Sequence, residues 1–259
     1  MSTVTQKTDA EPNSNEPPKL NFDVLKSEKL PSDSKPWREN ELPVDVLLLT
    51  GEECELLSCL SHLNKGSILK SYKNGIGHVF FGKIGEKNEL MKIAVIESYV
   101  EAIDTSITVL KAVEELGPKA VFCVGFCGAL DHKKVNLGDV IISKMVRTYA
   151  SISVMEKGIE DRNIAVPVPQ SIGAIIKRAD DGWTPPLKNP KELDLKRHKE
   201  GVFLSGPEEV NNKQRCEALV KLFPDAVAIE RQALGKRFKI LGNPKCMFPT
   251  THTKFWVCH

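Results

Sequence analysis

Residues 120–143 have the sequence AVFCVGFCGALDHKKVNLGDVIIS, which is the most informative segment of the chain for the fold class. Residues 120–125 form an apolar run without polar alternation, which is typical of a strand buried on both faces. Gly125 and Gly128 then predict a sharp turn in which the backbone comes close to another group. A second strand is expected at residues 139–143. Because small ligands bind at the carboxyl ends of strands in open α/β sheets, the turn is the first candidate for a binding site. A loop with two structural glycines is the alternative.

Strands and helices alternate on both sides of this stretch. Further strands are expected at residues 44–50, 68–72, 78–84, 91–96, 202–205 and 226–230. Helices are expected at residues 51–63, 101–116 and 169–179, and after a cap at Asn211 or Asn212. This order predicts an α/β fold with three layers, α/β/α, around a mixed central sheet.

The 259 residues divide into three parts by composition. Residues 1–43 are rich in Ser, Pro, Asn, Glu and Lys and are expected to be disordered, because they bury too little surface to offset chain entropy. Residues 44–230 form the expected domain. Residues 231–259 form an atypical C-terminal tail in which no buried strand is predicted.

The charge and the cysteine content indicate which partners and which compartment to expect. The net charge of +2 is too small to indicate nucleic acid or an acidic membrane as the main partner. Residues 1–40 lack the apolar core of a signal peptide, and no run is long enough to span a bilayer. The seven cysteines are an odd number scattered through apolar segments, which favours a reducing compartment, the cytoplasm.

Four segments, in order, resemble the purine and uridine phosphorylases and the methylthioadenosine/adenosylhomocysteine nucleosidases. They are VLLLTGEE at 46–53, VGFCGAL at 124–130 with LGDVI at 137–141, FLSGPEEVN at 203–211, and FPDAVAIE at 223–230. The resemblance implies cleavage of the N-glycosidic bond of a purine nucleoside. Family members commonly assemble as dimers, trimers or hexamers, so a homo-oligomer is among the expectations.

The chemistry of that bond explains which residues are needed. It breaks through a ribosyl cation-like state, so the protein must protonate the base, bind the ribose hydroxyls and present phosphate or water. The resemblance implies that Glu53 handles the water, although an acid in the first turn of a helix also complements the helix dipole. It also implies a set of substrate-binding positions, namely Gly125, Phe126, Cys127, Gly128, Val210, Glu230 and Gln232.

The chain departs from the family at several of these positions. Phe126 replaces a hydroxyl residue, which argues against phosphate as a co-substrate because an anion needs converging N–H and O–H donors. No cofactor is expected. Cys127 is interpreted as a packed thiol, since no His or Asn is tied to it by sequence. Glu209 replaces a stacking aromatic residue, Gln232 replaces a ribose-binding glutamate, and residues 97–101 are bulkier than the family's glycine-rich segment.

The family pattern ends at Glu230. The resemblance implies a later strand, a Ser-Asp dipeptide whose aspartate protonates the base, and a last helix, and residues 231–259 contain no Ser-Asp. Such a break is typical of an alternative exon or a gene-model error. The tail's Cys246, His252, Cys258 and His259 lack the paired spacing of a zinc site, so no metal is expected.

Three functions therefore stay open. The first is an enzyme that hydrolyses or phosphorolyses purine nucleosides, with catalysis impaired in this chain. The second is a non-catalytic relative that binds a nucleoside or a protein partner. The third is a non-functional truncated product.

Overall fold

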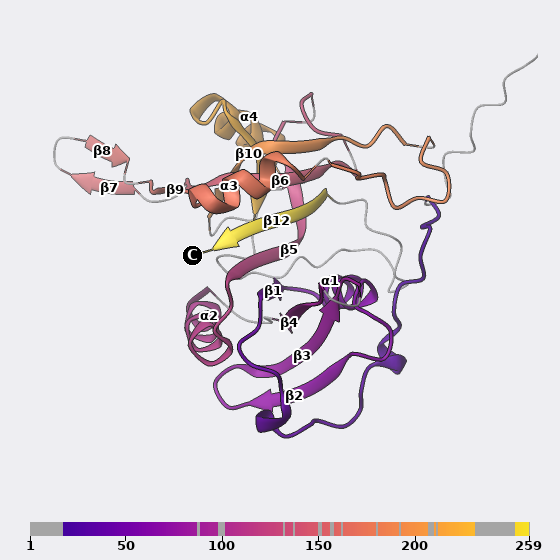
Figure 1. Cartoon of the computed structure of the whole chain (residues 1–259). Helices are drawn as coiled ribbons and strands as arrows, with labels where there is room; N and C mark the ends of the chain where they lie inside the picture. The colour runs from indigo at the N-terminus through magenta and orange to yellow at the C-terminus, as the bar shows by residue number, and fades with distance from the viewer. Residues whose placement is uncertain are drawn as a thin grey trace, which may run out of the picture.

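The computed structural model describes residues 18–86, 89–97, 102–131, 133–136, 138–149, 152–155, 158–161, 163–179, 181–191, 193–206, 210, 212–230 and 252–258. Within them a mixed sheet of ten strands is flanked by helices (Figure 1). The strand order is β11-β10-β6-β12-β5-β1-β4-β3-β2, with β9 paired to β6, and β7 and β8 form a separate hairpin. The predicted α/β class with a mixed sheet is confirmed.

The strands of the main sheet are three to ten residues long. Their bounds are β1 Val46–Thr50, β2 Leu69–Lys73, β3 Gly77–Ile84, β4 Met91–Glu97, β5 Ala120–Ala129, β6 Val140–Thr148, β9 Ala165–Pro167, β10 Arg197–Ser205, β11 Ala226–Glu230 and β12 His252–Cys258. The hairpin consists of β7 Ile152–Met155 and β8 Gly158–Asp161, which the sequence analysis did not predict.

In the part of the chain that the structure describes, four α-helices connect the strands, and each matches a predicted one. They are α1 Glu53–Ser61, α2 Ala102–Leu116, α3 Gln170–Lys177 and α4 Lys213–Leu222. The cap of α4 is Asn212, whose side chain accepts a hydrogen bond from the Arg215 N–H.

The alternation of side chains along β1 produces the three layers. Val46 and Leu48 belong to one apolar cluster with Leu56 and Leu60 of α1. The intervening Leu47 belongs to another cluster, together with Ala112 and Leu116 of α2. Since successive residues of a strand point to opposite faces, α1 and α2 cover opposite faces of the sheet, as Figure 1 shows.

The turn expected at residues 125–128 does not form, because β5 continues in extended conformation to Ala129. Neither Gly125 nor Gly128 has a positive φ. The extra length is stabilised by pairing, since Ile229 of β11 lies opposite Gly128 and β12 lies alongside residues 121–127. The close approach of other groups to both glycines, which was also expected, is confirmed.

The tail contains a strand that the sequence analysis did not predict. β12 lies between β5, to which it is antiparallel, and β6, to which it is parallel. β11 also pairs with β5, so β5, β12, β6, β10 and β11 form a closed ring of paired strands. Pairing on both sides satisfies the backbone groups that an open slot between β5 and β6 would expose.

Part of the segment expected to be disordered lies against the domain. Leu25 and Leu30 pack with the α1 cluster, and Trp37 packs edge-on against Phe81. Near its start, the Asn21 N–H donates to the Pro186 carbonyl at 3.1 Å. Residues 18–43 therefore form an N-terminal strap, held by a few large apolar side chains spaced too widely to show as a cluster in the sequence. Residues 1–17 lie outside the described part.

Candidate functional site

The carboxyl ends of β1, β4 and β5 meet at one edge of the sheet, and a buried carboxylate lies there. Glu55 is the third residue of α1 and is only 3% exposed. Its Oε2 accepts hydrogen bonds from the backbone N–H of Gly51 at 2.7 Å and of Glu52 at 3.1 Å. Its Oε1 accepts the N–H of Phe126 on β5 at 2.8 Å. One carboxylate thus joins the start of α1 to the end of β5.

Glu53, the acid singled out from the sequence, lies elsewhere. It is exposed at the first position of α1, and its Oε1 accepts a 2.6 Å hydrogen bond from the Ser27 hydroxyl of the N-terminal strap. The two residues differ because positions two apart on a helix do not share a face. The sequence did carry a signal for Glu55: an acid at the third helical position after Glu52 is the spacing of a capping box.

Gly125 and Phe126 surround the Glu55 carboxylate. A Cβ at position 125 would collide with the Oε1 of Glu55, so only glycine leaves room for the carboxylate. Phe126 contributes its N–H, while its side chain is half-buried. The backbone here approaches a protein carboxylate, which is the close approach that glycine permits.

Cys127 and Gly128 serve the packing of the ring of strands. The Cys127 side chain is buried in a cluster with Ile141 of β6, Phe203 of β10 and Ala228 of β11. That environment fits the packed thiol expected from the sequence. Gly128 lies exposed against Ile229, whose methyl group leaves little room for a Cβ.

The end of β11 reaches the same region. Glu230 is its last residue and pairs with Ser205 of β10, while the preceding Ile229 pairs with Gly128. Val210 packs against the cluster that contains Leu130 and Ile229. Val210 and the backbone of Glu230 therefore lie close to Gly128, through Ile229. Gln232 and Glu209 lie outside the described residues.

Two further polar residues complete this edge. Thr50 ends β1 and is 3% exposed, and its hydroxyl donates to the Ile96 carbonyl at 3.3 Å. Glu97 ends β4 and pairs with Thr50 in parallel register. Glu97 is bulkier than the family's glycine-rich segment, but no role was predicted for it from the sequence.

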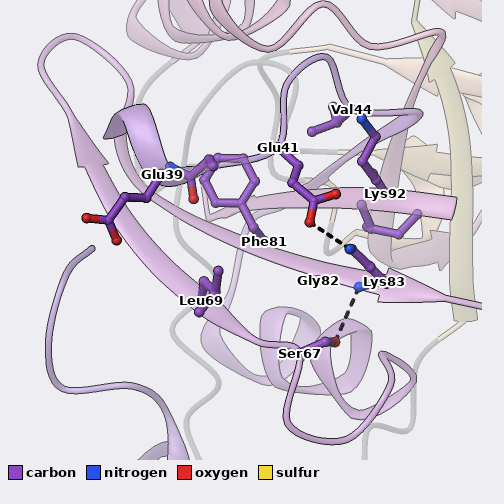
Figure 2. Close-up of a pocket in the computed structure, with 11 residues that line it drawn as sticks. Glu39, Glu41, Val44, Ser67, Leu69, Phe81, Gly82, Lys83 and Lys92 are labelled. Atoms are coloured by element: carbon purple, nitrogen blue, oxygen red, sulfur yellow. Dashed lines mark hydrogen bonds and ion pairs between the residues drawn. The ribbon is translucent and has the colours of Figure 1, made fainter. Parts of the chain in front are cut away.

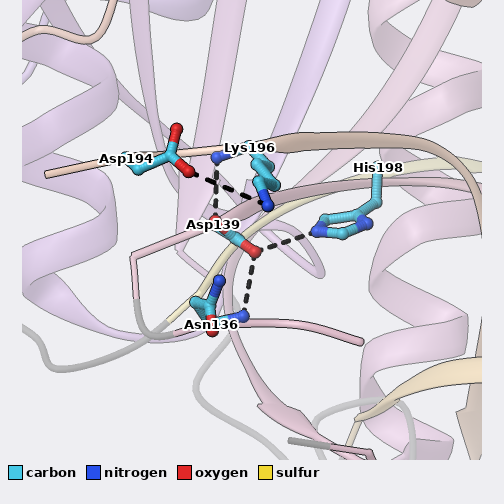
Figure 3. A network of polar contacts seen from close by, with 5 residues as sticks. All are labelled: Asn136, Asp139, Asp194, Lys196 and His198. Carbon is cyan, nitrogen blue, oxygen red and sulfur yellow. Dashed lines mark hydrogen bonds and ion pairs between the residues drawn. The ribbon is translucent and has the colours of Figure 1, made fainter. Parts of the chain in front are cut away.

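The Gly-Asp-Val segment forms a separate polar network (Figure 3). Asp139 is fully buried, and it accepts the N–H groups of Lys196 at 2.8 Å and Asn136 at 2.9 Å. The His198 Nε2 lies 2.9 Å from its Oδ2. Burial acts to raise the pKa of Asp139, but the hydrogen bonds from His198, Lys196 and Asn136 outweigh it and hold that pKa below its usual value. The network fixes β10 against the start of β6.

A shallow cavity near the N-terminal strap is not part of the site (Figure 2). It is lined by Val44, which precedes β1, and by Lys92 near the start of β4. It therefore opens at the amino ends of these strands. Its Lys83 is paired with Glu41 at 2.8 Å. We assign no ligand to it.

The described residues contain no group of three or more His, Cys, Asp or Glu side chains arranged to hold a metal ion. None of their helices has the length and apolar character that a membrane span requires.

Comparisons with known proteins agree with this architecture. The family model of the phosphorylase superfamily matches residues 46–230. The structure of a 5'-methylthioadenosine/S-adenosylhomocysteine nucleosidase from Colwellia psychrerythraea, in complex with adenine, has a TM-score of 0.56 and 14% sequence identity, covering 73% of each chain. At that identity the likeness concerns the fold.

Two curated relatives match in sequence. A Death domain-containing ATP nucleosidase from Amphimedon queenslandica is 26% identical over 213 residues, which are 74% of this chain and 39% of the relative. A 5'-methylthioadenosine/S-adenosylhomocysteine nucleosidase from Staphylococcus carnosus is 27% identical over 159 residues, 61% of this chain and 65% of the relative. The chain thus spans less than two thirds of both relatives.

The α/β fold agrees with the family model, which matches most of the folded part of the chain. The protein has an α/β fold, and the candidate site described above lies at the carboxyl edge of its sheet. The chain belongs to the phosphorylase superfamily.

Proposed function

We propose that this chain binds a purine nucleoside at the carboxyl edge of β1, β4 and β5 and hydrolyses its N-glycosidic bond. The observation that carries the proposal is the buried Glu55 carboxylate, held by the N–H groups of Gly51, Glu52 and Phe126. The role that the resemblance implied for Glu53 passes to Glu55, because Glu53 is exposed and hydrogen-bonded to the strap.

Glu55 acts as the general base. As the C1'–N bond of the ribose breaks, the base leaves with the bonding electron pair and the sugar becomes cation-like. A water molecule forms the new C1'–O bond and gives a proton to the Glu55 carboxylate, while the leaving base takes a proton from solvent. Three N–H donors keep the carboxylate in one position, which is what a general base requires.

The neighbouring residues bind the nucleoside. Glu230 and Gln232 accept the ribose hydroxyls, as the resemblance implies, and Gln232 does so with a neutral oxygen in place of a charged one. Val210 and the backbone of residues 125–128 contact the nucleoside. We assign none of the described residues to the protonation of the base, so turnover is expected to be slow. The proposal needs no cofactor.

A second candidate is nucleoside binding without turnover. It is favoured by Phe126, which places an apolar ring where a water-binding hydroxyl is expected. Calorimetry with adenosine and methylthioadenosine separates the two, because a binding protein releases heat and gains thermal stability without releasing base.

We also propose that the chain forms a homo-oligomer through α2. Ile107, Leu110 and Val113 form an α2 stripe, at 47%, 71% and 40% exposure, on one side of the helix. A stripe of this kind is self-complementary across a two-fold axis. We place the protein in the reducing cytoplasm, in keeping with Cys54, Cys59 and Cys216, which form no disulfide.

The test of the proposed hydrolysis is base release. The purified chain, in excess over a panel of purine nucleosides, is expected to liberate free base and free ribose. Absence of base from every nucleoside of the panel would contradict it.

A further inference from the structure

The proposed mechanism leaves one carboxylate at the carboxyl edge without a role. Glu97 is the last residue of β4, and its Cα lies opposite Thr50, the last residue of β1. Its Oε1 is shielded from solvent. A shielded acid at the mouth of a ligand site affects which charged species enter, because water screens its field poorly there.

The pleat of β4 directs Glu97 toward α1. Ile93 and Val95 belong to the cluster formed with Leu56 and Leu60 of α1, whereas Ile96 packs in the cluster on the α2 side. Alternate residues of a strand share a face, so Glu97 continues the row of Ile93 and Val95. It therefore lies on the face that carries Glu55.

Only one step along the backbone, from Thr50 to Gly51, separates the contacts of the two carboxylates. Glu55 accepts the N–H of Gly51, the residue directly after Thr50, at 2.7 Å. Glu97 is the register partner of Thr50 itself. Two acids thus flank the junction between β1 and α1.

The donors that would hold an anion at this junction are already engaged. The first N–H groups of a helix commonly bind phosphate, since they point outward and carry the positive end of the helix dipole. Here the N–H groups of Gly51 and Glu52 donate to Glu55 instead. The position where phosphate would attack is thereby lined with negative charge and lacks those donors.

We infer that Glu97 is a specificity-determining residue that excludes inorganic phosphate from the position of the nucleophile, so that the chain uses water. The inference rests on the proposed function, which it extends from the general base to the choice of nucleophile. It adds an electrostatic barrier to the effect of Phe126, which lacks the hydroxyl donor that an anion needs.

The test measures phosphate binding separately from catalysis. The full chain, its Glu97→Gln variant and a Glu97→Ala variant are melted with increasing inorganic phosphate, against chloride of equal ionic strength. Glu89→Gln is the matched control, since Glu89 is exposed at the opposite end of β4. Each protein is also incubated with methylthioadenosine, and the sugar product is identified as free or phosphorylated at C1'.

Phosphate is expected to leave the melting temperature of the wild-type chain and of Glu89→Gln unchanged. Both Glu97 variants should bind phosphate at least about tenfold more tightly than the wild type and melt higher in its presence. A part of any sugar that they release should carry phosphate. The inference is overturned if the wild-type chain is stabilised by phosphate, or if the Glu97 variants respond no more than Glu89→Gln. Absence of base release contradicts the proposed function alone, because the melting experiment still decides the role of Glu97.

Discussion

The backbone N–H of Phe126 donates a 2.8 Å hydrogen bond to the buried carboxylate of Glu55. This bond joins two segments 71 residues apart, the first turn of α1 and the end of β5. It places the acidic start of the first helix against the glycine-rich segment of the family motif.

Gly125→Ala should destabilise the protein by about 2–3 kcal/mol, because the new methyl group displaces the Glu55 carboxylate from its N–H donors. Urea denaturation measures the change. Gly173→Ala in α3 is the control, since its Cβ meets only a Val168 methyl group at 3.9 Å. That substitution should stabilise by about 0.5–1 kcal/mol through helix propensity. Equal effects of the two would contradict the close approach at Gly125.

The charge of Glu55 should be detectable at a neighbouring thiol. Burial, the largest cause, and the carboxylates of Glu55 and Glu52 together raise the pKa of Cys54 to about 11. Glu55→Gln removes one negative charge, so the pKa of Cys54 should fall and its alkylation should begin at lower pH. Peptide-resolved labelling with iodoacetamide against pH measures this. Glu53→Gln should leave the labelling profile of Cys54 unchanged, and an identical profile in Glu55→Gln would refute the prediction.

Asp139 should make stability depend on acid pH. Its folded-state pKa lies below the ordinary value of 3.8, so it contributes stability above that pH, and the contribution is lost as pH falls through the lower folded-state pKa. Asp139→Asn should therefore cost about 2 kcal/mol at neutral pH and progressively less in acid. Denaturation of both proteins over a pH series measures the difference. A constant difference down to strong acid would argue against a charged Asp139 in this network.

The fold could be predicted from the sequence where the local residue pattern and the packing favour the same element. Residues 101–116 combine apolar periodicity with a Gly-Pro stop, and residues 226–230 form a short apolar run. The elements predicted there match α2 and β11 within one residue. The packing of the N-terminal strap was not predicted. Leu25, Leu30 and Trp37 stand apart in the sequence and pack only against side chains of the folded domain. β12 was missed for a related reason: a strand in a closed ring is stabilised by its two neighbours, which single-segment patterns do not contain.

The site was accessible in outline only. Sequence motifs singled out residues 125–128 and the acidic start of α1 as candidate site residues, and the side-chain direction in the first helical turn is what favours Glu55 over Glu53 in the proposal. That direction depends on the N–H of Phe126, a contact remote in sequence. The two glycines were correctly expected to permit close approach, yet they lie in a strand, because pairing with β11 and β12 outweighs their preference for turns.

The α2 stripe should mediate self-association. Leu110→Glu places a charge at the centre of the stripe and should convert an oligomer to a monomer, measured by light scattering after size-exclusion chromatography. Leu222→Glu on α4, where the native side chain is 65% exposed, is the matched control and should keep the native mass. A monomeric wild-type protein would refute this role for α2.

Base release by a matched pair of variants tests whether Glu55 or Glu53 is the base that activates water. Glu55→Gln and Glu53→Gln remove one charge each from the same turn of α1, one from the buried carboxylate and one from the exposed carboxylate. With methylthioadenosine or adenosine as substrate, Glu55→Gln should lower the rate of base release by at least about 100-fold, while Glu53→Gln should stay within about twofold of wild type. The reverse order, or equal rates in both variants, would contradict the assignment of Glu55 as the base that activates water.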